Sequence, residues 1–294
     1  MASEALQRVL EKLRERPVVS GEPVEVWRAG MEERAKSFRP KEGTNFESVD
    51  AGGVRAEWVV PADADDRVLI YFHGGGYCCG SINTHRVLAS FLAHACRARV
   101  LNVDYRLAPE HPYPAGVEDG IAVYRWLRSQ NVPAAKIILG GDSAGGGLVV
   151  AALMSLRDAG DALPAAAVLI CPWTDLTMSG ESIRSGAEDE LIARLPDLIQ
   201  LKDWYLNGHD PADPMVSQIF GDLTSLPPLL VHVGNADILV DDGRRIAERA
   251  IEAGVATTLD EWNEMVHVWH SMAPILPEGQ QAIDRIGEFV RSHT

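Results

Sequence analysis

Short apolar runs recur along the chain and alternate with segments in which apolar residues repeat at helical spacing. The runs are nearly continuous, which is typical of strands that are covered on both faces. Strands are predicted at residues 67–73, 99–104, 136–139, 166–171, 228–233 and about 256–262. Helices are predicted at about residues 84–97, 115–130, 143–158, 240–253 and 277–292. This alternation predicts an α/β protein with a mainly parallel sheet and helices on both of its faces.

Three segments depart from the alternation. Residues 45–60 read as two strands around Ala51-Gly52-Gly53, which predicts an antiparallel hairpin at one edge of the sheet. Residues 1–40 and 178–214 contain apolar side chains that have no place in the predicted sheet. We expect these two segments to form one helical cap. The α/β domain would then comprise residues 41–177 and 215–294.

Composition narrows the classes of protein to which the chain can belong. Hydrophobic residues make up 46% and charged residues 23% of the 294 positions, which are ordinary values for a soluble domain. No run reaches the roughly 18 apolar residues that span a bilayer, and the first residues lack the apolar core of a secretory signal. We therefore expect a cytoplasmic protein without a membrane partner. The net charge of −15 repels phosphate backbones, so no nucleic-acid partner is expected.

The four cysteines lack the spacing of a metal site or of a disulfide framework. We interpret them as free thiols, so neither a metal ion nor disulfides are expected. They are Cys78, Cys79, Cys96 and Cys171. Cys78 and Cys79 are adjacent, but a disulfide between them is not expected in a reducing cytosol.

The sequence Gly141-Asp142-Ser143-Ala144-Gly145 lies directly between a predicted strand and a predicted helix. A serine on a sharp strand-to-helix turn needs neighbours without side chains, and its hydroxyl then projects beyond the sheet at a helix N-terminus. A glycine-rich helix start with Ser143 as its cap is the plainer interpretation. The strand–turn–helix context favours a nucleophile at Ser143.

The sequence His73-Gly74-Gly75-Gly76 follows the strand predicted at residues 67–73. Backbone N–H groups of such a loop can converge on the oxyanion that forms during acyl transfer. The N–H group of Ala144, directly after the nucleophile, is expected to join them. A phosphate cradle or a plain loop is the plainer interpretation of such a glycine cluster. A P-loop is excluded, because no Gly-Lys-Ser/Thr follows the glycines.

A serine nucleophile needs a histidine base. After a turn of this kind the chain order is nucleophile, acid and then histidine, which leaves His267 and His270 as candidates. The other histidines precede any suitable acid, lie within a strand, lie in the cap or end the chain. His267 comes first after the last predicted strand, where a loop can place it over Ser143, so it is the favoured base. We interpret His270 as a nearby core or surface residue.

The base in turn needs an acid that orients its ring. Asp237, Asp241 and Asp242 follow the strand predicted at residues 228–233. Asp237 is the closest to the carboxyl end of that strand, where α/β sheets build their sites. We therefore favour Asp237 as the acid and expect Asp241 or Asp242 to cap the next helix.

These motifs occur in one order over nearly the whole chain, which closely resembles the bacterial hormone-sensitive-lipase-like, or family IV, carboxylesterases. The motifs are His73–Gly76, Asp104–Glu110 (DYRLAPE), Gly141–Gly146, Asp237–Leu239 and His267. The resemblance implies an α/β-hydrolase fold with an eight-stranded, mostly parallel sheet and a cap made of the N-terminal helices and an insert.

The resemblance also implies a catalytic triad of Ser143, Asp237 and His267, without a metal ion or organic cofactor. The oxyanion hole would consist of Gly75, Gly76 and Ala144, with Gly74 as a further candidate.

The motif at residues 104–110 is interpreted as structural. We expect Arg106 to pair with Asp104 or Glu110 beneath the glycine loop. We also expect a cis peptide bond before one of the three nearby prolines, which are Pro109, Pro112 and Pro114. Many members of the family carry Gly-Phe after the catalytic histidine, whereas this chain has Val268-Trp269, and we expect that bulk to shape the pocket.

The expected reaction is hydrolysis of esters with short to medium acyl groups, of about C2 to C8, in an enclosed apolar pocket. The pocket is expected to comprise Tyr77, Trp27, Met31, Trp204, Tyr205, Leu206 and Val268. Hydrolysis of lactones, such as monoterpene lactones, is the alternative with the same triad. A receptor without activity, like the related plant gibberellin receptor, is a remote alternative. That receptor lacks the triad histidine, whereas this chain has His267. A homodimer through the edge strand after Gly254 is a further expectation.

Overall fold

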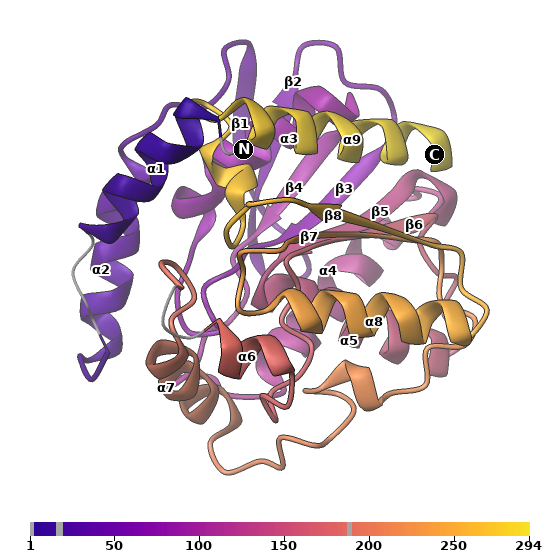
Figure 1. Ribbon diagram of the computed structural model, residues 1–294. Helices are drawn as coiled ribbons and strands as arrows, with labels where there is room; N and C mark the ends of the chain where they lie inside the picture. Colours follow the sequence, from indigo (N-terminus) through magenta and orange to yellow (C-terminus); the bar gives the residue numbers. More distant parts are fainter. Residues whose placement is uncertain (1–2, 16–19, 187–189) are drawn as a thin grey trace.

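The computed structural model describes residues 3–15, 20–186 and 190–294, which form an eight-stranded sheet flanked by helices (Figure 1). The strand order is β1-β2-β4-β3-β5-β6-β7-β8. The pairs β1–β2 and β2–β4 are antiparallel, and all the other neighbouring strands are parallel. The strands are β1 (Thr44–Asp50), β2 (Arg55–Pro61), β3 (Val68–Phe72), β4 (Arg99–Val103), β5 (Ile137–Asp142), β6 (Ala166–Ile170), β7 (Leu229–Gly234) and β8 (Thr257–Trp262). The predicted parallel sheet and edge hairpin are thus confirmed.

Helices cover both faces of the sheet. Buried side chains of α4, α5 and α8 form one core cluster with the sheet, and those of α1, α3 and α9 form a second cluster. The helices are α1 (Glu4–Arg14), α2 (Val24–Ala35), α3 (Ile82–Cys96), α4 (Ala115–Ser129), α5 (Ala144–Asp158), α6 (Glu181–Ser185), α7 (Leu195–Leu206), α8 (Val240–Glu252) and α9 (Pro277–His293). Short 3₁₀ turns occur at Ala134–Lys136, Gln218–Phe220 and Trp269–Met272. No helix in the described ranges is long and apolar enough to cross a bilayer.

Strand β3 shows why the apolar runs are continuous. Val68, Ile70 and Phe72 contribute to the core cluster on one face of the sheet, and Leu69 and Tyr71 contribute to the cluster on the other. Successive side chains of a strand point to opposite faces, so a strand covered on both faces needs apolar residues at every position.

The two segments assigned to the cap lie on one side of the molecule, where α2 and α7 approach each other (Figure 1). The Trp27 ring of α2 packs edge-on against the Trp204 ring of α7, with 6.0 Å between the ring centroids. The short helix α6 instead joins the α/β domain, since the Ser182 hydroxyl donates to the Ile238 carbonyl at 2.6 Å.

The expected pairing of Arg106 with Asp104 or Glu110 is wrong. Arg106 bonds Asp119 of α4 through its backbone N–H and its guanidinium, and Asp104 pairs with Arg55 at 3.2 Å. Glu110 is held by Arg28, whose two terminal nitrogens each lie 2.7 Å from a carboxylate oxygen.

Arg28 is therefore the arginine that supports the glycine loop. It comes from α2 and also donates to the carbonyl of Cys78 at 2.8 Å and to that of Ala108 at 2.9 Å. The sequence alone does not indicate this pairing, because its two residues are 82 positions apart. Two peptide bonds in this turn are cis, Ala108–Pro109 and Tyr113–Pro114.

The expected cap of the helix after Asp237 is also wrong. The N-cap of α8 is Leu239, without a side-chain cap bond, and both aspartates lie in the first turn of the helix. Asp242 instead accepts the N–H groups of Thr174 and Asp175 at 2.8 Å each. Asp241 accepts the N–H group of Ser182 at 2.9 Å. Both carboxylates thus tie α8 to the segment that follows β6.

Candidate active site

Ser143 stands on a strained turn between β5 and α5. Its backbone lies at φ 54° and ψ −122°, a conformation that costs free energy for a residue with a side chain. Its flanking glycines leave room for the backbone alone: a Cβ at Gly141 would lie 2.5 Å from the backbone of Gly145, and one at Gly145 would collide with the carbonyl of Phe72. The sequence around Ser143 is therefore required by the turn that exposes the hydroxyl.

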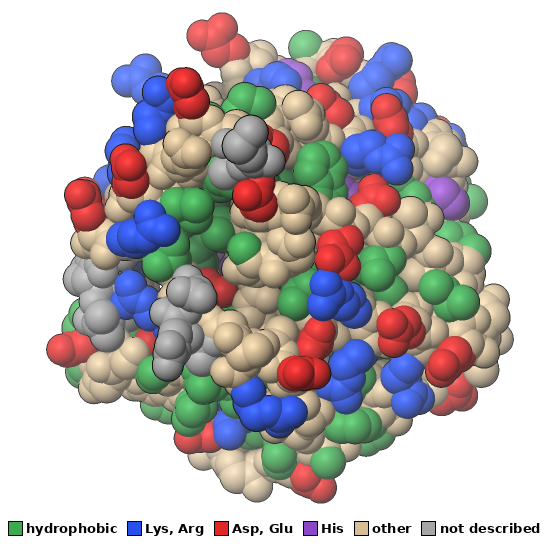
Figure 2. All heavy atoms as spheres, in the orientation of Figure 1, with side chains coloured by type: hydrophobic (Ala, Val, Ile, Leu, Met, Phe, Trp, Pro, Cys, Tyr) green, Lys and Arg blue, Asp and Glu red, His purple; other side chains and the backbone are tan. Residues whose placement is uncertain are grey.

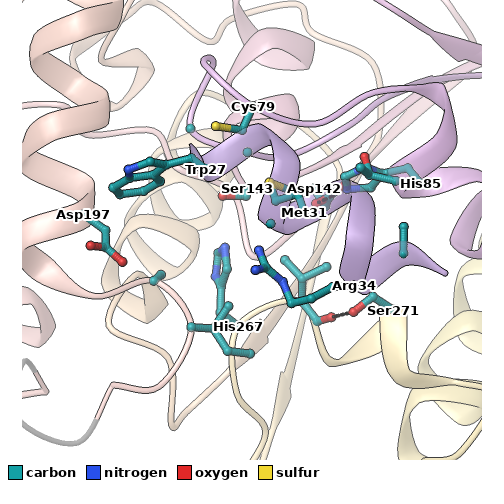
Figure 3. Close-up of a pocket in the computed structure, with 18 of the residues that line it drawn as sticks. Trp27, Met31, Arg34, Cys79, His85, Asp142, Ser143, Asp197, His267 and Ser271 are labelled. Atoms are coloured by element: carbon teal, nitrogen blue, oxygen red, sulfur yellow. Dashed lines mark hydrogen bonds and ion pairs between the residues drawn. The ribbon is translucent and has the colours of Figure 1, made fainter. Parts of the chain in front are cut away.

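Asp237 and His267 form a direct hydrogen bond. Asp237 follows β7, His267 lies in the loop after β8, and His267 Nδ1 is 2.7 Å from Asp237 Oδ2. The other carboxylate oxygen of Asp237 accepts the N–H group of Leu239 at 2.9 Å. Figure 3 shows the His267 ring rising from its loop toward Ser143. The three residues predicted from chain order thus lie in one region of the structure, with Ser143 7%, Asp237 3% and His267 6% exposed.

The surroundings of His267 favour its protonated form. Burial by itself lowers the pKa of the imidazole, but the charge and hydrogen bond of Asp237, with a smaller contribution from Cys171, raise the pKa of His267 well above its ordinary value. An imidazole with a raised pKa accepts a proton readily, which suits a general base once it is neutral.

The glycine loop lies beside Ser143. Gly75 and Gly76 line the same cavity as Ser143 and adopt φ values of +118° and +61°, which favour glycine. In the described part of the chain their N–H groups donate to no other protein group, and Ala144 opens α5, where the first N–H groups have no acceptor within the helix. A Cβ at Gly74 would lie 3.1 Å from Ser143 Cβ, so this residue packs against the nucleophile turn.

A buried polar network supports the loop from below. Asp142 accepts a hydrogen bond from the Tyr71 hydroxyl at 2.7 Å and lies 3.4 Å from His85 Nε2. Burial alone would raise the pKa of Asp142, but His85 and Tyr71 lower it. The Tyr105 hydroxyl donates to the carbonyl of His73 at 2.8 Å. Burial and the neighbouring His85 lower the pKa of His73 to about 3, so this histidine stays neutral.

A cavity of about 330 Å³ opens over Ser143 and His267. Its walls come from α2, the glycine loop, the first half of α3, residues 191–201 and the loop after β8. Of the residues predicted for the pocket, Trp27, Met31 and Val268 line this cavity. Arg34, Asp197, Leu198, Leu201 and Met272 also line it and were not predicted, because hydrophobicity alone does not show which face of a cap helix points inward.

The other four residues predicted for the pocket do not line it, which corrects that expectation; they are Tyr77, Trp204, Tyr205 and Leu206. The rings of Tyr77 and Tyr205 stack on each other with their centroids 3.9 Å apart. The backbone carbonyl of Tyr205 accepts a hydrogen bond from the backbone N–H group of Tyr113 at 2.9 Å. The end of α7, from Trp204 to Leu206, therefore lies outside the cavity wall, to which α7 contributes Asp197, Leu198 and Leu201.

Val268 is unusual, because a β-branched residue occupies a left-handed conformation, with φ 49° and ψ 44°. Its N–H group points to the sulfur of Cys171 at 3.4 Å.

One group of side chains brings possible metal-binding atoms within 4.8 Å of one another, and it consists of Cys171, Asp237 and His267. No other such group occurs in the described ranges. Burial raises the pKa of Cys171 to about 11, and a protonated thiol is a poor metal ligand. The other three thiols are also buried and free.

Comparison with known proteins defines the class first. The chain matches the family with the alpha/beta hydrolase fold over residues 69–271, more than half of its length. An esterase of the bacterial hormone-sensitive lipase family is 46% identical, with coverage of 100% of this chain and 99% of that one and a TM-score of 0.97. The crystal structure of EstE5 soaked with ethyl alcohol is 43% identical, with 99% coverage of both chains and a TM-score of 0.96.

Curated relatives agree with the solved structures. The acetyl-hydrolase of Streptomyces hygroscopicus is 49% identical over 246 residues, which are 84% of this chain and 82% of that protein. An esterase of Acinetobacter venetianus is 33% identical over 263 residues, 89% and 87% of the two chains. The chain belongs to the bacterial hormone-sensitive-lipase-like esterases of the α/β-hydrolase fold, and it is a serine carboxylesterase. An enzyme is thus favoured over a receptor.

Proposed function

We propose that Ser143, His267 and Asp237 hydrolyse carboxylic esters through an acyl-enzyme. The observation that carries this proposal is the 2.7 Å bond between His267 and Asp237 beside a cavity that both Ser143 and His267 line. The bond to Asp237 holds Nδ1 of the ring, which leaves Nε2 as the nitrogen that faces the nucleophile.

The proposed cycle has two halves. His267 takes the proton of the Ser143 hydroxyl while its oxygen attacks the ester carbonyl, and the negative charge on the carbonyl oxygen is stabilised by the N–H groups of Gly75, Gly76 and Ala144. The intermediate collapses, and the departing alcohol takes the proton from His267. Water then attacks the acyl-enzyme with the same proton transfers and releases the acid. The residues required for this cycle are all in the chain.

We propose acyl groups of short to medium length as substrates, of about C2 to C8. The volume of about 330 Å³ and the apolar side chains of Trp27, Met31, Leu198 and Leu201 support this range. The acetyl-hydrolase relative is consistent with its lower end. The same chemistry would open a lactone, which remains the alternative.

A series of p-nitrophenyl esters and lactones tests this proposal together with Ser143→Ala. The p-nitrophenyl acetate, butyrate and octanoate should be hydrolysed faster than the palmitate, because a long chain exceeds the cavity. Ser143→Ala should lose on the order of 10⁴-fold in kcat with its circular dichroism unchanged. Faster hydrolysis of palmitate than of butyrate would overturn the size assignment, and substantial activity in Ser143→Ala would overturn the nucleophile.

We also propose that residues 1–40 and 178–214 act as the cap. The contributions of α2 and α7 to the cavity wall support this assignment, although α6 packs with the α/β domain.

A homodimer could form through β8, which is a terminal strand of the sheet. Charges of both signs are scattered over the face in Figure 2 without a broad basic patch, in keeping with no nucleic-acid partner. The free thiols fit a cytoplasmic location.

A further inference from the structure

Arg34 introduces a positive charge into the wall of the catalytic cavity. It lies in the last turn of α2 and lines the same cavity as Ser143 and His267. Figure 3 shows the Arg34 side chain among those that line the cavity, with its guanidinium turned inward. The side chain remains exposed to solvent, so a ligand in the cavity can reach it.

No side chain in the described ranges neutralises Arg34: it takes part in no hydrogen bond or ion pair there. Other arginines around the site are paired, such as Arg28 with Glu110 and Arg86 with Glu57. Although Arg34 is exposed as a whole, partial burial of the side chain lowers its pKa, and the Cys79 thiol opposes this only in part. A guanidinium nevertheless stays protonated in proteins, so Arg34 is a cation with no carboxylate partner among the residues that the structure describes.

The local structure of α2 leaves room for this cation. A Cβ at Gly30, one helical turn before Arg34, would lie 3.2 Å from Arg34 Nη1, so the guanidinium lies over Gly30. Glycine is unfavourable inside a helix, and here it leaves space that a side chain would take from the guanidinium. Gly30 and Arg34 both line the cavity.

The carboxylates of the cavity wall are engaged elsewhere. Asp142 is bonded to Tyr71 and lies close to His85 beneath the glycine loop. Asp197 accepts a hydrogen bond from Ser20, and Figure 3 places it on the opposite side of His267 from Arg34. The side of the cavity next to Arg34 is therefore the side suited to a negative group.

We propose that the cavity accepts esters that carry an anionic group, such as a carboxylate, and that Arg34 binds this group. The inference rests on the proposed function and adds a class of substrate to it. The planar guanidinium can donate two parallel hydrogen bonds to a carboxylate, which gives direction as well as attraction. Arg34 is then a specificity-determining residue, and the hydrolysis itself is unchanged.

The test compares 3- and 4-acetoxybenzoate with the neutral 4-acetoxybenzamide. All three carry the same acetyl group, and the two benzoates place the charge at two distances from the scissile bond. The measured quantity is the ratio of kcat/KM for each benzoate to kcat/KM for the benzamide. Arg34→Gln should lower this ratio about tenfold for at least one benzoate, as expected for the loss of a charge-assisted hydrogen bond. Arg34→Lys should retain part of the preference for that benzoate over the benzamide, because the positive charge remains.

Arg39→Gln is the matched control, because Arg39 is exposed, lies in the same segment and does not line the cavity. It removes the same net charge and should leave the ratio unchanged. An unchanged ratio in Arg34→Gln, or an equal fall in Arg39→Gln, would overturn the anion site while the esterase assignment stands. A wild-type protein that hydrolyses neither the benzamide nor p-nitrophenyl acetate would overturn the proposed function instead.

Discussion

At the scale of single residues, the reactivity of the site depends on what surrounds one edge of the His267 ring. Asp237 Oδ2 holds Nδ1 at 2.7 Å, and the pKa of His267 is raised well above its ordinary value despite burial. A base must be neutral to accept a proton, so kcat/KM should rise with pH through the pKa of His267. The acid limb of the profile should therefore lie above the ordinary histidine pKa of about 6.5.

Asp237→Asn tests this assignment through the pH profile. The substitution removes the charge that raises the pKa of His267, while burial continues to lower it, so the acid limb should move to lower pH. The maximal kcat should fall by roughly 10⁴-fold, because an amide no longer holds the reactive tautomer. The measurement is kcat/KM for p-nitrophenyl acetate between pH 5 and 9. An acid limb that stays in place or moves upward would contradict the role of Asp237.

Single residues also show what the sequence could predict. Ser143, Asp237 and His267 could be predicted, since chain order and the strand–turn–helix context restrict each of them. Arg28 and Arg34 could not, because their roles depend on how α2 packs over the glycine loop. Nothing in the order of residues indicates that Arg28 rather than Arg106 supports that loop.

At the scale of elements, the glycine loop after β3 is held between the sheet and the cap. Gly76 lies beneath Leu201 of α7, and a Cβ at Gly76 would approach Leu201 Cδ1 to 2.5 Å. Its φ of +61° is also unfavourable for a residue with a side chain. The proposed oxyanion hole and the position of α7 are therefore coupled through this contact.

Gly76→Ala should displace the loop and weaken an oxyanion donor. We expect kcat to fall by about 10²- to 10³-fold, with a smaller change in KM, because the donor acts mainly on the transition state. Leu201→Ala in the same chain should recover part of the loss by removing the clash. Gly160→Ala is the control, since Gly160 also has a positive φ, of +75°, but has open space around it. Wild-type kcat in Gly76→Ala would show that the loop does not stabilise the oxyanion.

Elements differ in how well the sequence predicts them. Strands and the helices between them were predicted to within a few residues, because burial on both faces forces a continuous apolar run. The cap was harder, because an amphipathic helix does not show which of its residues face a cavity. Tyr205 and Leu206 are apolar and lie in α7, yet they pack away from the cavity.

At the scale of the whole molecule, buried histidines make stability depend on pH. The pKa of His73 is lowered to about 3, that of His232 is lowered, and that of His270 is lowered well below its ordinary value, with burial as the main cause in each. In the unfolded chain these rings bind protons near pH 6.5. The unfolded state therefore binds more protons below that pH, and stability is lost as the pH falls.

His267 acts in the opposite sense, because its pKa is raised in the folded protein. Its contribution is fully present below about pH 6.5 and is lost as the pH rises through its folded pKa. The summed contribution of these four histidines to the free energy of unfolding should therefore be greatest near pH 6.5. His270→Gln should flatten the acid side by up to about 1.4 kcal/mol per pH unit. Urea unfolding between pH 5 and 8.5 measures the free energy of unfolding of the wild-type protein and of His270→Gln. A wild-type stability that increases steadily as the pH falls from 6.5 to 5 would contradict the lowered pKa values of the buried histidines.

A p-nitrophenyl alkylphosphonate shows whether Ser143 is the residue that becomes acylated. The Ser143 oxygen would displace p-nitrophenolate from phosphorus and form a stable bond, and peptide mass mapping locates the label. We expect one p-nitrophenolate to be released per chain, a label on Ser143, loss of esterase activity in proportion to labelling, and no label in Ser143→Ala. Inactivation with the label on another residue, or full activity with Ser143 fully labelled, would contradict acylation at Ser143.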